Sequence, residues 1–539
     1  MIVSQSNKPL VFFTVLAGLL YLPAYLINLN LVQLINDEAI RAIVAFEMIK
    51  SGDFITPTIG GVPYLMKPPL FNWILALFFQ LSGSWSETVI RLPVILSVIL
   101  FAATIFVFIR KEFGNRVALI NALAFVTYGR ILFYESMHGL IDITFSWLIY
   151  IFFMLSWHFF RKKKYLALFL AAYAITAVAY LLKGLPSLVF VAVTLVVLFI
   201  QGKQIRMLFN WRHLLGLCLL ISIVGGYYFV YFMNNTVGPG QVFDVLTGEV
   251  TRRTAVRFGI WNALLHLLTY PFENIYHFLP WSVMVILFLR KGSLKLIREN
   301  KFLWYLLVVF LFNIIPYWTS PEAYARYILM LVPLFMTILF ALYFECREKG
   351  SRIYLVVDYI LGGFIGVISL AGIVFMLHPA INGLPHIAWV SVLLFLALGL
   401  ISYFYWKQDL NRLFWLAIAL LVIRIAFDYS IIPSWEKSHP GVATKKLATE
   451  LGAETAGRPL YVYWNPEFKP DPYYHYRFND EIFTYYLSTA RNKIITLSMD
   501  KIPGTLFLAR EDHLDTADYI LVKKIGMARK VPVFLIEFK

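Results

Sequence analysis

The stretch DEAIRAIVAFEMIKSGDFITPTIGGVPYLMKPPL, residues 37–70, is a polar loop between two strongly apolar segments. It carries several charged side chains together with Gly60–Gly61 and Pro68–Pro69, residue types that make sharp and rigid turns. Long ordered loops are usually functional, and residues 37–50 carry a regular helical pattern that argues against disorder. We therefore predict that this loop forms the active site.

The composition of the chain places this loop in a membrane protein. Of 539 residues, 60% are hydrophobic and only 14% are charged, and a soluble protein of this length could not bury that much apolar surface. Cys218 and Cys346 supply neither a disulfide framework nor a metal site. The predicted fold class is mainly α. It is a polytopic membrane protein with interfacial helices in the first outer loop and a small C-terminal α/β soluble domain.

About thirteen apolar segments are candidates for transmembrane helices, each of which needs roughly 20 apolar residues. The first is too long and too evenly apolar for a cleavable signal, so we interpret it as a span. The predicted spans lie at 10–30, 88–109, 116–131, 139–160, 165–182, 185–201, 213–233, 274–290, 302–317, 326–344, 355–377, 387–406 and 411–432.

Basic residues in the short loops predict the orientation of these spans. Lys and Arg recur in every second loop, and basic loops stay cytoplasmic. The clusters are 110–116, 161–164, 203–212, 290–301, 347–352 and 407–412. This alternation predicts a protein of the inner (plasma) membrane with a cytoplasmic N-terminus and an extracytoplasmic C-terminal domain. Much of the net charge of +16 is then a signal of topology, and no nucleic-acid partner is predicted.

The chain is expected to divide near residue 432. Residues 1–432 form the predicted transmembrane domain, with a first outer loop at 31–87 and a second large outer loop at 234–273. Residues 433–539 have the charge density and short periodic segments of a soluble α/β domain. There VATKKLATELGAE and DEIFTYYLSTARN predict helices, and PLYVYW, IITLS, DYILVKK and VPVFLIEF predict strands.

Asp37, Glu38 and Asp142 are the candidate catalytic carboxylates. Adjacent residues on a helix point about 100° apart, so only one of Asp37 and Glu38 can face a given site. Asp142 lies one turn inside the outer end of a predicted span, where an ionised group costs about 2.5–3.5 kcal/mol and usually faces a cavity or a partner. The alternative for Asp37 is a helix cap that pairs with Arg41 at i,i+4. For His138, a packed interfacial histidine is the interpretation that we favour.

The rest of the loop combines an amphipathic helix with a rigid turn. Ile40, Ile43, Val44 and Met48 form an apolar stripe, as expected for a helix at the membrane interface. The prolines and glycines that follow hold the backbone and present Lys67 from a stiff turn.

The motifs DE…GDFITP…GGVPYLMKPPL…RLP resemble the first outer loop of bacterial GT-C glycosyltransferases of the aminoarabinose-transferase and protein-mannosyltransferase superfamily (glycosyltransferase family 39). LLKGLP at 181–186, GEVTRR at 248–253, LPWS at 279–282 and RYILMLVP at 326–333 extend the likeness across all the predicted spans. The resemblance implies an integral-membrane, inverting glycosyltransferase, a hexosyl- or pentosyltransferase of the cell envelope. It would move a sugar from a polyprenyl-phosphate donor to a lipid (lipid A-like), glycan or protein acceptor on the extracytoplasmic face.

The resemblance also implies roles for individual residues. Asp37 matches the catalytic acidic residue of the family, and a carboxylate can orient the acceptor or accept its proton. Lys67, Arg326 and Tyr327 match positions near the lipid phosphate, which cations bind through charge-assisted hydrogen bonds. The remaining candidates, for contact with the acceptor or with membrane lipid, are Arg41, Glu249, Arg252, Arg253 and His138. A solvated basic surface is the alternative for Arg252 and Arg253.

The chain departs from the family pattern at two positions. The arginine that follows Asp37–Glu38 is displaced by one residue, to Arg41, and Met66 stands where an acidic residue usually precedes KPP. Met66 removes one candidate metal ligand, so a divalent metal stays open but is not indicated, and no other cofactor is predicted. Both departures leave the sugar and the acceptor open.

A transporter or flippase for a lipid-linked or anionic substrate is the main alternative function. Such proteins place polar groups at mid-membrane on broken helices, in halves related by a repeat. Here the polar groups gather in outer loops, and the chain ends in a soluble domain. A membrane-anchored binding protein is a weaker alternative because it would need no multi-span cavity. The pair Arg424 and Asp428, at i,i+4 near the end of the last span, is interpreted as structural.

Overall fold

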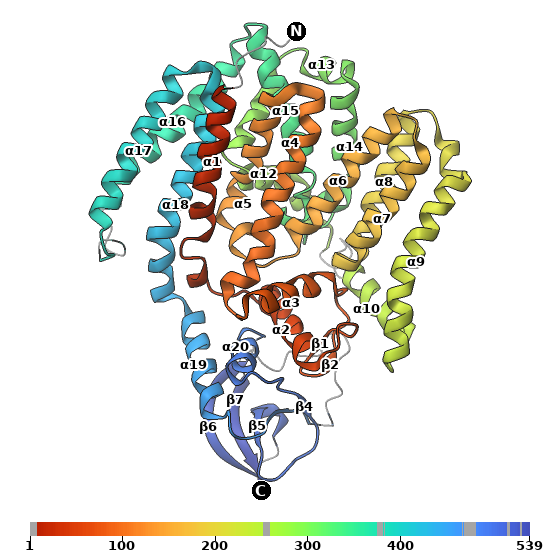
Figure 1. The fold of residues 1–539 in the computed structure, drawn as a ribbon, viewed down its shortest axis with the longest axis vertical. Coiled ribbons are helices and arrows are strands. Elements are labelled where there is room, and N and C mark those ends of the chain that lie inside the picture. Colours follow the sequence, from red (N-terminus) through yellow and green to blue (C-terminus); the bar gives the residue numbers. More distant parts are fainter. Residues whose placement is uncertain are drawn as a thin grey trace.

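The computed structural model describes residues 8–251, 259–374, 381, 383–465, 467, 481–514, 518–528 and 531–539. A bundle of long helices stands above a small sheet domain, and the two helices of the first outer loop lie between them (Figure 1). The polar loop that the sequence singles out therefore occupies the junction between the two parts of the molecule.

The helices of the bundle are joined partly by short turns and partly by the two large outer loops. They are α1 (Lys8–Leu26), α4 (Glu87–Val126), α5 (Gly129–Phe133), α6 (Asp142–Arg161), α7 (Tyr165–Lys183), α8 (Pro186–Gln201), α9 (Trp211–Asn234), α12 (Ile260–His277), α13 (Ser293–Glu299), α14 (Lys301–Trp318), α15 (Val332–Glu348), α16 (Ile353–Val374), α17 (Ile387–Lys407) and α18 (Arg412–Ser438). Short 3-10 helices η1 (Leu29–Leu31), η2 (Glu135–Met137), η3 (Ile205–Phe209), η4 (Trp281–Leu289), η5 (Ala325–Ile328) and η6 (Asp409–Asn411) join several of them.

Among the described residues, nine helices are long and apolar enough to cross a membrane, which confirms the predicted fold class. The longest, Glu87–Phe133, contains two of the predicted spans, which meet at Gly114 with φ 79°. Glycine adopts that positive φ without strain, so α4 bends there. The predicted span at 185–201 is the shorter apolar helix Pro186–Gln201. Those at 274–290 and 326–344 are built largely from η4 and from η5 with α15.

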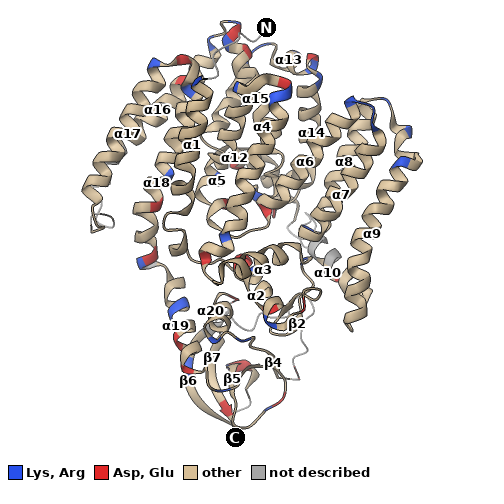
Figure 2. Cartoon of the chain, viewed as in Figure 1, with Lys and Arg blue, Asp and Glu red and all other residues tan. Residues whose placement is uncertain are grey.

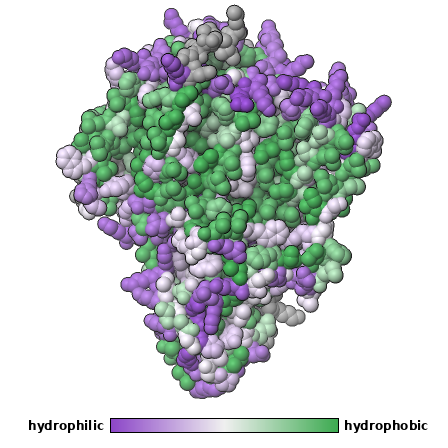
Figure 3. Space-filling model, in the orientation of Figure 1, coloured by the Kyte–Doolittle hydropathy of each residue, from purple (hydrophilic) through white to green (hydrophobic). Residues whose placement is uncertain are grey.

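Charge and hydropathy divide the bundle into a wide apolar belt and two polar ends. Charged residues concentrate at both ends of the helices (Figure 2), and a broad hydrophobic surface lies between two hydrophilic zones (Figure 3). The basic loops meet at one end. Arg161 pairs with Glu112 at 2.9 Å, and Arg347 donates to the backbone oxygen of Asp409 at 2.6 Å. This clustering agrees with the alternation of basic loops, while the side of the membrane that each end faces stays a prediction.

The first outer loop folds as two helices separated by a hairpin. Helix α2 (Asn36–Ser51) precedes the strands β1 (Thr58–Ile59) and β2 (Val62–Pro63), and α3 (Leu70–Ser82) follows them. Most of the apolar stripe of α2 is covered, since Ile43, Val44 and Met48 are buried and Ile40 is partly buried. Helix α2, which was expected to lie at the membrane interface, thus also packs against the rest of the protein. The second large outer loop contains α10 (Pro239–Thr251).

The C-terminal part is a five-stranded mixed sheet with two helices. Its elements are α19 (Pro440–Glu454), β3 (Leu460–Tyr463), α20 (Glu481–Arg491), β4 (Leu497–Ser498), β5 (Leu506–Arg510), η7 (Glu511–His513), β6 (Tyr519–Ala528) and β7 (Val531–Phe538). The strand order is β4-β3-β5-β7-β6. Strand β3 runs parallel to β4 and β5, whereas β7 is antiparallel to β5 and β6. Every predicted helix and strand is present, β5 is an additional strand, and the predicted boundary at 432 falls inside α18.

Candidate active site

Asp37 and Arg326 form an ion pair at the outer end of the bundle. Asp37 lies in the first turn of α2, and Arg326 lies in η5, directly before α15. The Arg326 Nη2 atom is 3.0 Å from Asp37 Oδ2, although 289 positions separate the two residues. The side chain of Asp37 is 55% exposed and that of Arg326 is 15% exposed. An accessible carboxylate therefore meets a largely buried cation.

A second ion pair joins Asp142 and Lys183. Asp142 begins α6 and Lys183 ends α7, and the Lys183 Nζ atom is 2.6 Å from Asp142 Oδ1. The Nζ atom also lies 4.6 Å from the centre of the Tyr327 ring, close enough for a cation–π contact. Asp142, which was predicted to face a cavity or a partner, thus has a cationic partner from the neighbouring helix.

The two ion pairs belong to one electrostatic cluster. The charges of Lys67 and Arg326 both act on the Asp142 carboxylate. The charges of Asp142 and Asp37 also act on Arg326, which is cationic because a guanidinium keeps its proton in proteins. The tertiary structure thus brings the predicted site residues Asp37, Asp142, Lys67, Arg326 and Tyr327 into one neighbourhood.

Glu38 lies apart from this cluster. Its side chain is fully buried and accepts hydrogen bonds from Arg91 Nε at 2.7 Å and from Arg91 Nη2 at 3.1 Å. The backbone N–H of Gly139 donates to it at 2.8 Å. A Cβ atom on Gly139 would lie 2.6 Å from Ile90 Cγ2, so this close approach requires glycine. Glu38 thus holds α2 against α4, and Asp37 faces Arg326, as the divergence of adjacent helical residues predicts.

The other predicted contact residues have varied surroundings. Arg41 is buried and donates from Nη2 to the Tyr64 hydroxyl at 3.1 Å, while Asp37, its expected i,i+4 partner, pairs with Arg326. His138 Nδ1 lies 2.8 Å from the backbone oxygen of Tyr134, and burial lowers the pKa of His138.

The side chains of the remaining candidates are not described. Glu249 lies in α10, but its side chain is not described, and Arg252 and Arg253 lie outside the described residues. Arg424 and Asp428 form a buried pair at 2.7 Å, in line with the structural interpretation.

Glu47 ties the hairpin that precedes Lys67 to helix α2. Its carboxylate accepts hydrogen bonds from the Thr58 hydroxyl at 2.8 Å and from the N–H groups of Gly60 at 2.6 Å and Gly61 at 3.2 Å. Both glycines have positive φ, 63° and 75°, as a two-residue hairpin turn requires. Burial raises the pKa of Glu47, and these three hydrogen bonds oppose that rise. The position of Lys67 is thereby linked to the helix that carries Asp37.

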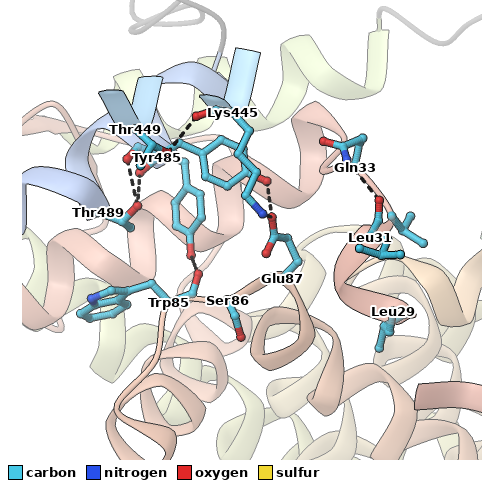
Figure 4. Close-up of polar contacts among 12 residues, drawn as sticks. Leu29, Leu31, Gln33, Trp85, Ser86, Glu87, Lys445, Thr449, Tyr485 and Thr489 are labelled. Carbon is cyan, nitrogen blue, oxygen red and sulfur yellow. Dashed lines mark hydrogen bonds and ion pairs between the residues drawn. The ribbon is translucent and has the colours of Figure 1, made fainter. Parts of the chain in front are cut away.

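The C-terminal domain supports the same helix from outside. Helix α20 packs on α2, and Leu497 N donates to Gly60 O in the hairpin at 3.1 Å. The Tyr485 hydroxyl donates to Trp85 O at 2.6 Å, and Lys445 and Tyr486 both bind the Glu87 carboxylate (Figure 4). The soluble domain therefore contacts the loop on both sides of Lys67.

The sequence reasoning missed three charged residues at this end of the bundle. Lys183 is the partner of Asp142, Arg91 is the partner of Glu38, and Glu135 pairs with Arg130 at 2.7 Å. A signal existed for Lys183, because it ends an apolar helix in LLKGLP, and charges inside spans are usually paired. Within the part of the chain that the structure describes, no group of three His, Cys, Asp or Glu residues is placed to hold a metal ion.

Both a family model and solved structures resemble this chain. Residues 66–228 match the family model of dolichyl-phosphate-mannose-protein mannosyltransferase. The fold matches the crystal structure of ArnT from Cupriavidus metallidurans bound to undecaprenyl phosphate, with a TM-score of 0.64, 17% identity and 98% coverage of each chain. The apo structure of the same protein matches with a TM-score of 0.65 at the same identity and coverage. Together these findings show that the chain has the fold of ArnT and that residues 66–228 are similar to the mannosyltransferase family.

A curated relative is more similar in sequence but matches over a shorter length. An uncharacterized protein of Aquifex aeolicus (strain VF5) is 24% identical over 306 residues. That match covers 56% of this chain and 59% of the relative. The chain is thus similar to that relative over little more than half of the length of either protein.

Proposed function

We propose that this protein transfers a sugar, with inversion, from a polyprenyl-phosphate donor to an acceptor on the extracytoplasmic face of the inner membrane. The observation that carries the proposal is the cluster in which Asp37, Asp142 and Arg326 meet at one end of the bundle. The likeness to ArnT, whose crystal structure contains undecaprenyl phosphate, supports a polyprenyl-phosphate donor. The acceptor is a lipid (lipid A-like), a glycan or a protein.

The reaction needs a positively charged place for the leaving group. When the bond between the anomeric carbon and the phosphate oxygen breaks, the electron pair leaves with the phosphate. Lys67 and Arg326 supply cations for that phosphate. Hydrogen bonds between a cation and a phosphate are stronger than hydrogen bonds between neutral groups. Because the sugar–phosphate bond already has a good leaving group, holding the reactants in line is the main further task.

Asp37 serves as the carboxylate on the acceptor side. Its exposed side chain pairs with Arg326, so a donor phosphate that binds Arg326 would compete for this cation and release the carboxylate. Asp37 then orients the acceptor hydroxyl and takes its proton as the new bond to the anomeric carbon forms. Asp142, held by Lys183, keeps a second negative charge close to the developing positive charge of the sugar.

A direct transfer assay tests this function. Purified protein is incubated with radiolabelled polyprenyl-phosphate sugars and with a lipid, a glycan or a peptide acceptor, and the label is followed. We expect the label to move to an acceptor and polyprenyl phosphate to be released. Movement of intact donor across a liposome membrane without cleavage would instead establish the flippase alternative.

The proposed orientation has its own test. Reporter fusions at Lys163, in a basic loop, and at Lys501, in the C-terminal domain, should give opposite readings, because basic loops stay cytoplasmic. Fusions that give the same reading would contradict the cytoplasmic N-terminus and the extracytoplasmic C-terminal domain.

A further inference from the structure

Glu135 is a buried carboxylate that the proposed reaction has not used. It lies in η2, between α5 and the start of α6, and its side chain is 0% exposed. The Oε1 atom accepts a hydrogen bond from Arg130 Nε at 2.7 Å. The Oε2 atom has no hydrogen-bond partner among the described residues. Such an atom is costly to leave unpaired in a buried place, and where it persists it requires an explanation.

A complementary atom belongs to Arg326. The Nε–H group of Arg326 is also buried and without a hydrogen-bond partner among the described residues, while its Nη2 atom binds Asp37. The charges of Arg326 and of Asp142 both act on Glu135, so Glu135 borders the cluster described above. One unsatisfied acceptor and one unsatisfied donor are thus present in the same charged neighbourhood.

The chemistry of Glu135 Oε2 and Arg326 Nε indicates which kind of ligand group could bind both atoms. A carboxylate oxygen repels a phosphate, so the phosphate group itself is a poor partner for Oε2. A sugar hydroxyl can donate to Oε2, and a neighbouring sugar oxygen can accept from Arg326 Nε. The acceptor substrate is a weaker candidate for the ligand of Glu135. The proposed reaction places that substrate at Asp37, which is 55% exposed at the rim, whereas the Glu135 side chain is fully enclosed.

We propose that Glu135 is a sugar-recognition residue, whose Oε2 atom accepts a hydrogen bond from a hydroxyl or an amino group of the donor sugar. This inference rests on the proposed glycosyltransferase function. Burial raises the pKa of Glu135 to about 7, against the opposing effect of Arg130. At pH 7 about half of the Glu135 side chains are therefore ionised, and the ionised form accepts hydrogen bonds best.

The variant Glu135→Gln tests this role with little change in shape. The amide oxygen can still accept from Arg130, but an NH₂ group replaces the Oε2 acceptor. The probes are undecaprenyl phosphate that carries a neutral hexose, the same lipid with an amino sugar, and bare undecaprenyl phosphate. We expect the variant to bind a sugar-bearing lipid at least roughly tenfold more weakly than wild type, the value of a hydrogen bond to a charged group. Its affinity for the bare lipid should be unchanged.

The two sugar-bearing probes distinguish the two kinds of sugar group. A larger loss with the amino sugar assigns an ammonium to Oε2, and a larger or equal loss with the neutral hexose assigns a hydroxyl. An equal loss for the bare lipid, or no loss for any lipid, would overturn the role in sugar recognition. A wild-type protein that binds bare lipid but no sugar-bearing lipid would instead overturn the proposed donor class, and this inference with it.

Glu112→Gln is the matched control. Glu112 also pairs with an arginine, Arg161, at 2.9 Å, but at the opposite end of the bundle, so all three affinities should stay at the wild-type level. If Glu135→Gln does not fold, wild-type protein answers the same question with donors that lack single hydroxyl or amino groups. One such donor should bind about tenfold more weakly, and equal binding of the whole series would overturn the proposal.

Discussion

Asp37 at the start of α2 and Arg326 in η5 are 3.0 Å apart, joined across 289 positions of the chain. Asp37, which resembles the family's catalytic acidic residue, is thus the ion-pair partner of Arg326, which resembles a residue near the lipid phosphate. A phosphate that binds Arg326 changes the surroundings of Asp37 directly. If the donor phosphate binds Arg326 as proposed, donor binding and the exposure of Asp37 are coupled through this one ion pair.

The variant Asp37→Asn separates the two roles of this residue. Asparagine keeps the shape and is as good a residue at a helix start as aspartate, so folding and expression should be near normal. A lost base or orienting carboxylate should lower the transfer rate by about 10²–10⁴. Donor affinity should not fall, because Arg326 then has no competing carboxylate.

Asp53→Asn is the control for Asp37→Asn. Asp53 lies on the same loop and accepts from the N–H groups of Ile55 and Thr56, contacts that asparagine can keep, so transfer should be nearly unchanged. A well-folded Asp37→Asn protein with full activity would return Asp37 to a purely structural role.

Lys67→Ala and Arg326→Ala test the proposed phosphate site. Each change removes a cation from the cluster around Asp142 and should weaken donor binding by about 1.5–3 kcal/mol, the value of a hydrogen bond to a charged group. Titration with undecaprenyl phosphate measures the affinity directly. Arg161→Ala, at the other end of the bundle, should bind as wild type does, and unchanged affinity in both site variants would reject the assignment.

The ion pair of Asp142 and Lys183 allows stability and activity to be separated. Lys183→Met leaves a buried carboxylate without its cation and should destabilise the protein by about 3–5 kcal/mol. Adding Asp142→Asn removes the stranded charge and should restore much of the melting temperature. If Asp142 also acts in the reaction, the double variant stays inactive although it is stable. A stable and active double variant would show that Asp142 serves packing alone.

Glu135 predicts a pH dependence of stability with a definite sign. Burial raises its pKa from 4.5 to about 7 in the folded protein. Its contribution to stability is complete below the unfolded value and is lost as the pH rises through about 7, because the carboxyl must then ionise in a buried place. Between about pH 5 and pH 8 the melting temperature of wild type should therefore fall more than that of Glu135→Gln. Parallel melting curves of the two proteins across this range would contradict the assignment.

The local pattern of the sequence determined the architecture and part of the site. A long apolar segment can be recognised as membrane-spanning from its own residues. In the bilayer, each segment must satisfy its backbone hydrogen bonds internally and carry few charges. The same holds for the C-terminal helices and strands, whose periodicity is short-range. The polar loop between spans, with Asp37 and Lys67, stood out for this reason. Two of the predicted spans form the single helix Glu87–Phe133, and others correspond to a short helix or a 3-10 segment such as η4, because hydropathy does not distinguish these forms.

The pairing of charges was decided only by the tertiary structure. Asp37 could pair with Arg41 one turn away, and the fold placed Arg326 of η5 beside it instead. Glu38, next to Asp37 in the chain, became a buried partner of Arg91. Charge–charge energies depend on distance and burial, and both are properties of how distant helices pack. Residue order alone therefore named most of the charged groups at this site, and the fold chose which of them meet.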